Sequence, residues 1–163
     1  HRFSAFTASV LQLRPESAGH LTIKSANMDE HPEIHPNYLA TDTDCRTLVK
    51  GIQIARKIAQ TEPLKSHITQ EHAPGAGVAE DDEVAILDWA RRTAVTIYHP
   101  TGTCKMGIDP MAVVDPTLRV KGVQGLRVAD ASIMPQIVSG NTNAPAIMIG
   151  EKAAAFILKD ARQ

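Results

Sequence analysis

Apolar residues recur with a helical period in three stretches of this 163-residue chain, and these stretches predict its helices. The first helix is expected from Thr41 or Asp42, either of which can cap it, to about Gln60. Its apolar face consists of Cys45, Leu48, Val49, Ile52, Ala55 and Ile58. The second begins in the acidic cluster at 80–83, which the positive end of a helix dipole favours. Its inward positions are expected to be Val84, Leu87 and Ala90, with Trp89 beside them. The third, Ala144 to Lys159, is largely apolar.

Strand patterns are short and mostly precede the helices. Phe3 to Leu13 is apolar with β-branched members, and a turn at 15–20 leads to a second predicted strand, Leu21 to Ser25. These two segments are expected to form an antiparallel hairpin. Asn27 to Asn37 holds two prolines and is expected to be a loop.

A second pair of short strands is expected late in the chain, at 118–120 and 126–129, around the turn that contains Gly122 and Gly125. Most of 93–115 has no period and is expected to be loop. Hairpin strands followed by helices, without βαβ alternation, predict the α+β class, with antiparallel strands packed against helices.

The composition excludes some classes of function but does not identify one. Hydrophobic residues make up 43% of the chain, charged residues 21% and aromatic residues 4%, and the net charge is -1. Such a chain has no basic surface for nucleic acid and few rings on which bases could stack. No apolar run is long enough to cross a bilayer, and the first residues show no secretory signal pattern. With two cysteines, Cys45 and Cys104, a cytoplasmic, reducing location is expected.

One histidine stands out in the segment Y-H-P-T-G-T-C-K-M-G at 98–107. Pro100 restricts His99 to an extended backbone, and Gly102 and Gly107 allow an irregular loop around it. Catalytic groups often lie on such loops. An imidazole placed there could act as a general base.

A second segment, S-G-N-T-N-A-P at 139–145, precedes the last predicted helix. Its Asn and Thr residues suit helix capping, and Pro145 suits the first turn. The first N–H groups of a helix also attract a carbonyl or an anionic group of a ligand. The carboxamide of Asn141 or Asn143 could hydrogen-bond an alcohol oxygen.

Two other groupings are less favoured. Cys104, His99 and Asn143 could form the set of a thiol hydrolase, but Cys104 lacks a nucleophile signature and is interpreted as a small buried hydrophobe. His31 and His35 lie among acidic residues, but Pro32 and Pro36 beside them favour a solvated loop, and no metal site is predicted.

The two segments, and the Val128–Pro135 stretch between them, resemble the C-terminal part of the glucose–methanol–choline (GMC) flavin oxidoreductases. The resemblance implies that His99 faces the flavin as the catalytic base and that Asn143 is its partner. Asp130 and Ala131 match the dipeptide whose backbone approaches FAD. The cofactor-binding segment under the isoalloxazine is then Asn143, Ala144 and Pro145.

The resemblance also implies an organisation. Residues 1–97 would belong to the substrate-binding domain, and 98–163 would supply the catalytic loop, the flavin-contacting segment and the C-terminal helix that complete the FAD site. No G-x-G-x-x-G occurs anywhere in the sequence. We therefore expect a piece of a larger enzyme whose N-terminal Rossmann half is absent from this chain, and which is inactive by itself.

The implied function is FAD-dependent oxidation of a small-molecule alcohol. His99 would take the hydroxyl proton and Asn143 would hold the oxygen, so activity should rise with pH as the imidazole loses its proton. A primary or aliphatic alcohol is expected as substrate. Choline, for which an aromatic cage would be needed, is one alternative. A non-catalytic α+β binding or scaffold domain is another.

Overall fold

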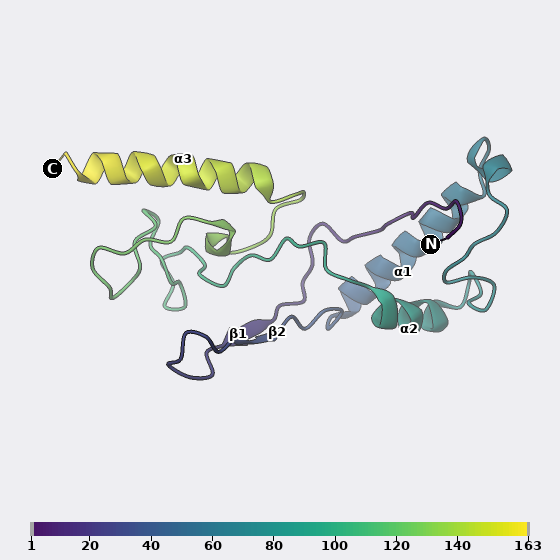
Figure 1. Ribbon diagram of the computed structural model, residues 1–163, viewed down its shortest axis with the longest axis horizontal. Helices are drawn as coiled ribbons and strands as arrows, with labels where there is room; N and C mark the ends of the chain where they lie inside the picture. The colour runs from purple at the N-terminus through teal and green to yellow at the C-terminus, as the bar shows by residue number, and fades with distance from the viewer. Residues whose placement is uncertain (1, 163) are drawn as a thin grey trace. The chain divides into compact units, whose positions relative to one another are not determined.

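The computed structural model describes residues 2–162 and divides the chain into two compact units. Unit 1 contains the chain up to Gly19 together with Pro36–Val95, and unit 2 contains His20–His35 and the chain from Thr96 onward. Figure 1 labels the α-helices and the strands of both units. Helices and a small antiparallel sheet are both present, as expected for the α+β class.

Unit 1 is built on two helices, α1 (Asp42–Ala59) and α2 (Glu83–Thr93), with a short 3-10 turn, η1 (Leu64–His67), between them. Thr41 caps α1, since its hydroxyl accepts a hydrogen bond from the Asp44 N–H, and Asp82 caps α2 in the same way. The core consists of buried side chains from the two helices: Cys45, Val49, Ile86 and Ala90. The predicted start and extent of α1 are confirmed.

The predicted inner face of α2 is wrong at Val84, whose side chain is 80% exposed, whereas Ile86 is fully buried. Ile86 and Ala90 are four residues apart and therefore share a face of the helix. Val84 is two residues before Ile86, about 200° away around the helix axis, and so faces solvent.

The predicted strand at Phe3–Leu13 is also wrong. Within residues 2–162 the one named sheet joins two later segments, and 3–13 takes no part in it. The segment lies instead along α1, where the Val10 side chain approaches Gly51 so closely that an added Cβ would lie 3.2 Å away. Phe6, Leu11 and Leu13 remain about half exposed. An apolar run of this kind forms a strand only where it has a hydrogen-bonding partner.

The sheet of unit 2 is a hairpin of β1 (His20–Thr22) and β2 (Glu33–His35), paired antiparallel with His20 opposite His35. The second predicted strand is thus confirmed in part, over Leu21 and Thr22. The loop prediction for 27–37 is wrong at β2, because Pro32 and Pro36 flank the strand and leave its ladder positions intact. The rings of His20 and His35 stack across the pair, with centroids 4.7 Å apart.

The core of unit 2 lies under the last helix, α3 (Asn143–Asp160), beside the 3-10 turn η2 (Ala131–Ile133). It is formed by Val114, Leu118, Ile133, Met134, Ile149 and Ala153. The strands predicted at 118–120 and 126–129 appear as isolated bridges, Val114 with Val120 and Arg119 with Arg127. Gly122 and Gly125 adopt φ values of 78° and 72°, which keep the intervening turn tight.

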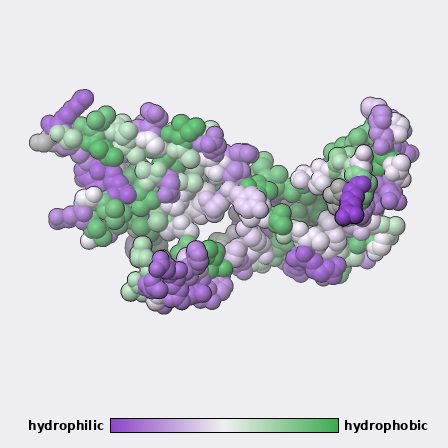
Figure 2. Space-filling view, viewed as in Figure 1, coloured by the Kyte–Doolittle hydropathy of each residue, from purple (hydrophilic) through white to green (hydrophobic). Residues whose placement is uncertain are grey.

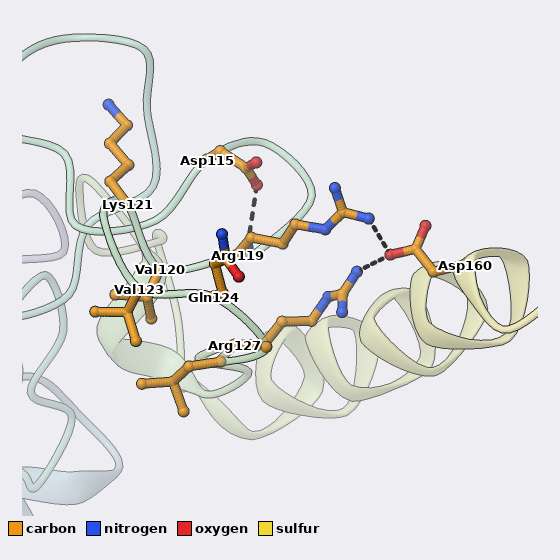
Figure 3. Close-up of a pocket in the computed structure, with 10 residues that line it drawn as sticks. Asp115, Arg119, Val120, Lys121, Val123, Gln124, Arg127 and Asp160 are labelled. Carbon is orange, nitrogen blue, oxygen red and sulfur yellow. Dashed lines mark hydrogen bonds and ion pairs between the residues drawn. The ribbon is translucent and has the colours of Figure 1, made fainter. Parts of the chain in front are cut away.

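The C-terminal end of α3 is held to this turn by two ion pairs, in which Arg119 and Arg127 both donate to Oδ2 of Asp160 (Figure 3). Hydrogen bonds from the two guanidinium groups hold the pKa of Asp160 below its ordinary value. The face of α3 away from the core includes four apolar residues that are each at least half exposed, Ile147, Met148, Ile157 and Leu158. Figure 2 shows hydrophobic surface interspersed with hydrophilic surface along this helix. Among the described residues, no helix has the length and apolar content needed to cross a membrane.

Candidate active site

The loop that carries His99 is held against unit 2 by main-chain hydrogen bonds. The Cys104 N–H donates to the Ser132 carbonyl at 3.0 Å, and the Met106 N–H donates to the Ile133 carbonyl at 2.7 Å. Both acceptors belong to η2, whose Ile133 is part of the buried core. The irregular loop is therefore attached to a turn that forms part of the core of its unit.

The backbone next to His99 turns sharply. Tyr98 has a φ of 64°, a rare conformation for a residue with a Cβ, and its N–H donates to the Thr96 hydroxyl at 3.0 Å. Further along, Gly102 has a φ of 89° and packs so that an added Cβ would lie 3.4 Å from the Met134 carbonyl oxygen. Together with Pro100, these positions set the direction in which the histidine leaves the loop.

His99 and Thr142 are joined directly, although 43 residues separate them in sequence. The distance from His99 Nδ1 to Thr142 Oγ1 is 2.8 Å, and both side chains are half-buried. The imidazole is thus held at the start of α3. Within the described residues no hydrogen bond is made by its other nitrogen, Nε2, so this nitrogen is available for proton transfer.

The capping role predicted for the Asn and Thr residues before α3 needs correction. Thr142 occupies the cap position, with φ -81° and ψ -2°, but its side chain makes no capping hydrogen bond. Its hydroxyl is bonded to His99 instead. The first helical hydrogen bond runs from the Ala146 N–H to the Thr142 carbonyl at 2.9 Å.

Within the described part of the chain, the N-terminus of α3 therefore presents main-chain donors that have no acceptor in the helix. The N–H groups of Asn143 and Ala144 precede the first helical hydrogen bond, and Pro145 has no N–H. The side chains of Asn143 and Ala144 are exposed, and Pro145 is half-buried. Asn143, the predicted partner of His99, adjoins Thr142 in the chain, but the hydrogen bond to the imidazole comes from Thr142.

Asp130 and Ala131 lie at the start of η2, next to the anchored loop. The Asp130 carboxylate accepts a hydrogen bond from the Ser132 N–H at 2.7 Å and caps the turn. Ala131 packs against the core of unit 2. Asp130 is exposed, so the surface of unit 2 at this point is a main-chain turn with a carboxylate beside it.

The competing sites gain no support from the geometry. Cys104 is half-buried, and among the described residues the side chain that is hydrogen-bonded to His99 is that of Thr142, not that of Cys104. Across residues 2–162, no three His, Cys, Asp or Glu side chains gather in a group that could hold a metal ion. A cleft of about 530 Å³ is lined by Arg119, Lys121 and Arg127 among others and by none of the predicted site residues. Both of its arginines are paired with Asp160 (Figure 3).

Comparison with known proteins decides the family. The model described as GMC oxidoreductase matches residues 15–150, which include the His99 loop, η2 and the start of α3. The chain belongs to the GMC oxidoreductase family. This confirms the resemblance on which the site was predicted.

The curated relatives of this GMC chain are much longer than it is. An alcohol dehydrogenase [acceptor] from Pseudomonas putida is 48% identical over 94% of the chain and 28% of its own length. The mitochondrial choline dehydrogenase of Homo sapiens is 47% identical over 94% of the chain and 26% of its own length. The chain therefore spans about a quarter of the curated relatives it matches.

Solved structures agree with this placement. A formate oxidase from Aspergillus oryzae, studied for FAD modification, superposes with a TM-score of 0.85 at 30% identity, over 92% of this GMC chain and 26% of its own. As in the sequence comparison, the region that matches is a small part of the larger protein.

Thr142 is the residue that sequence reasoning did not assign. It stands between Asn141 and Asn143, where a hydroxyl is expected to cap the helix. Nothing in its position along the chain pointed to a histidine 43 residues earlier. Only the fold of unit 2 brings the two side chains together.

Proposed function

We propose that this chain is the C-terminal part of an FAD-dependent GMC enzyme that oxidises an alcohol, with His99 as the base. The observation that carries the proposal is the hydrogen bond between His99 and Thr142. It places an imidazole beside the uncapped N-terminus of α3, so that a proton acceptor and a cluster of main-chain donors lie within one unit. Family membership and the FAD-linked structural relative support the assignment.

The residues at the start of α3 fit the flavin end of the cofactor. The N–H groups of Asn143 and Ala144 have no helical acceptor, and the Thr142 side chain does not cap them. The positive end of the helix dipole adds to their attraction for a carbonyl or an anionic ring. We assign Asn143, Ala144 and Pro145 to this contact, and the turn at Asp130 and Ala131 to the ribityl or diphosphate region.

The chain's own chemical task is then to move a proton. An alcohol becomes a carbonyl compound when its hydroxyl proton and a hydride from its carbon are removed. FAD, when bound, supplies the hydride acceptor. In this scheme Nε2 of neutral His99 accepts the hydroxyl proton, and the carboxamide of Asn143 holds the substrate oxygen in reach.

The remainder of such an enzyme must bind the rest of FAD. The chain contains no G-x-G-x-x-G, and its curated relatives are more than three times longer. We therefore assign the Rossmann half that cradles the diphosphate to residues outside this chain. The exposed apolar face of α3 is where an adjoining part of the enzyme could pack.

The relatives suggest two candidate substrates, an uncharged alcohol and choline. Identities of 48% to an alcohol dehydrogenase and 47% to a choline dehydrogenase do not separate them. The low aromatic content, 4%, favours an aliphatic alcohol, because a quaternary ammonium group is commonly held by aromatic rings. We expect an uncharged primary aliphatic alcohol to be oxidised with a higher kcat/KM than choline, which carries the quaternary ammonium group.

The test uses the intact enzyme that contains this chain, purified with its flavin and supplied with an artificial electron acceptor. Turnover of either alcohol, with bleaching of the flavin absorbance when the acceptor is omitted, supports the proposal. A protein that binds FAD but is reduced by neither alcohol would contradict it. Preference for choline would overturn the substrate assignment alone.

A further inference from the structure

Thr142 lies within the segment at 139–145 that carries the family resemblance, where no catalytic role is predicted for it, yet its hydroxyl is hydrogen-bonded to the imidazole. We infer that Thr142 is a positioning residue that holds His99 in the tautomer protonated at Nδ1 and so leaves Nε2 as the basic nitrogen. The inference rests on the proposed role of His99 as a base. It concerns how the imidazole of the base is oriented, whereas the roles proposed for Asn141 and Asn143 concern the substrate oxygen and the flavin.

The geometry fixes which nitrogen is engaged. His99 Nδ1 and Thr142 Oγ1 are 2.8 Å apart, a normal length for a hydrogen bond in which a hydroxyl takes part. A hydroxyl can donate or accept, so two neutral arrangements satisfy the distance. In one, Nδ1–H donates to Oγ1 and Nε2 carries the lone pair. In the other, the threonine donates and Nε2 already carries the proton.

The proposed chemistry selects the first arrangement. A base whose Nε2 is already protonated has its lone pair directed at Thr142, where no substrate can reach it. With Nδ1–H donating to Oγ1, the same hydrogen bond persists after Nε2 takes a proton, and it then becomes charge-assisted and stronger. Neither side chain has to rotate between the neutral and the cationic state of the base.

Thr142 is also held firmly enough to act in this way. Its carbonyl accepts the first helical hydrogen bond of α3, from the Ala146 N–H at 2.9 Å, which fixes its backbone. Threonine is β-branched, so its χ1 angle is restricted. Because its hydroxyl does not cap the helix, removing that hydroxyl should leave the helix start intact.

A first experiment reads the tautomer directly in this chain by 15N-edited NMR, at a pH where the imidazole is neutral. Histidine 99 is identified among the seven histidines by the signal that disappears in His99→Gln. We expect Nδ1 to carry the proton in the wild type and in Thr142→Ser, which keeps the hydroxyl. In Thr142→Val, which has nearly the same shape without a hydroxyl, the Nε2–H form should gain population.

A second experiment measures flavin reduction by the alcohol in the intact enzyme. Thr142→Val should slow this step by about tenfold to a hundredfold, the size of effect seen when a reacting group is left misplaced. The loss should fall in kcat more than in KM, because the base acts in the transition state. Thr142→Ser should restore both the rate and the tautomer.

The outcomes separate this inference from the proposed function. If His99→Ala is slow while Thr142→Val keeps the wild-type rate and tautomer, the base stands and the role of Thr142 is overturned. A slow Thr142→Val that serine does not rescue also overturns it, because the effect then comes from packing. If His99→Ala reduces its flavin at the wild-type rate, the proposed function itself fails.

Discussion

Two polar side chains, Asp44 in unit 1 and His99 in unit 2, are both held by hydrogen bonds but differ in how many of their polar atoms are bonded. Asp44 is 3% exposed, and its two carboxylate oxygens accept hydrogen bonds from the Glu16 N–H at 3.0 Å and the Ser17 N–H at 2.8 Å. His99 is half-buried, and within residues 2–162 one of its ring nitrogens is hydrogen-bonded while the other is not. Asp44 is satisfied, whereas His99 keeps an unused proton-transfer site.

The difference indicates what each residue is for. A buried carboxylate with main-chain donors on both oxygens fastens the segment at 16–17 to the first turn of α1, and a group so enclosed cannot reach a substrate. A half-buried imidazole with one fixed and one unpaired nitrogen is oriented and still accessible. Mutations should therefore affect stability at Asp44 and chemistry at His99.

The largest expected effect is the loss of activity in His99→Ala. Flavin reduction by the alcohol in the intact enzyme should slow by roughly 10²–10⁴-fold, the usual contribution of a positioned acid–base group. The melting temperature should change little, since the half-buried side chain makes one hydrogen bond. Stopped-flow absorbance and thermal unfolding measure the two quantities. A melting temperature that collapses along with the rate would place His99 with Asp44 as a structural residue.

The next effect is on stability in Asp44→Asn. The amide group of asparagine has one acceptor oxygen in place of two, so one of the two part-buried N–H groups loses its partner, at a cost of about 1–3 kcal/mol in the free energy of unfolding. The single tryptophan, Trp89, lies in α2 and reports on unit 1 in urea. Asp42→Asn is the matched control, since Asp42 is an exposed carboxylate in the same helical turn. Equal losses in the two variants would mean that the helix dipole, not the buried network, is the cause.

A smaller effect should appear in acid. Burial by itself would raise the pKa of Asp44, but the hydrogen bonds from Glu16 and Ser17 outweigh it and bring the pKa below its ordinary value of 3.8. The carboxylate therefore stabilises the fold above that value, and the contribution is lost as the pH falls through the lowered pKa. The free energy of unfolding, measured in urea by the fluorescence of Trp89, should decrease as the pH falls from about 5 to about 3. This decrease in the free energy of unfolding should be smaller in Asp44→Asn. An equal decrease in the variant and the wild type would show that protonation of Asp44 is not its cause.

The smallest effect is expected for Cys104→Ser. The thiol lies in the same loop as His99, but it takes no part in moving the hydroxyl proton, and its loop position is held by main-chain bonds. Alcohol turnover by the intact enzyme should stay close to that of the wild type. An inactive Cys104→Ser with an active His99→Ala would favour thiol chemistry and reverse the roles assigned here.

The features that sequence could predict are those that depend on neighbours along the chain. Thr41 lies directly before α1 and caps it, and the apolar run of α3 identifies the last helix. The strand predicted at 3–13 failed because pairing depends on a partner that local pattern does not reveal.

The candidate site also has a part that local sequence could predict and a part that it could not. His99 and the start of α3 were recognised from short local strings, and the comparisons confirm the family that those strings suggested. The contact between His99 and Thr142 joins residues 43 positions apart, and the folded core of unit 2 brings them together. No periodicity or capping rule could have predicted it, because the capping rule assigned the threonine hydroxyl to the helix instead.

The most direct test of the account is the pH dependence of flavin reduction in a single turnover with saturating alcohol, for the intact enzyme and its His99→Gln variant. The account predicts that the wild-type rate rises with pH and levels off once one imidazole has lost its proton. The variant should be slow and nearly independent of pH over the same range. A variant that keeps the same rise with pH would show that another group is the base and would contradict the central claim.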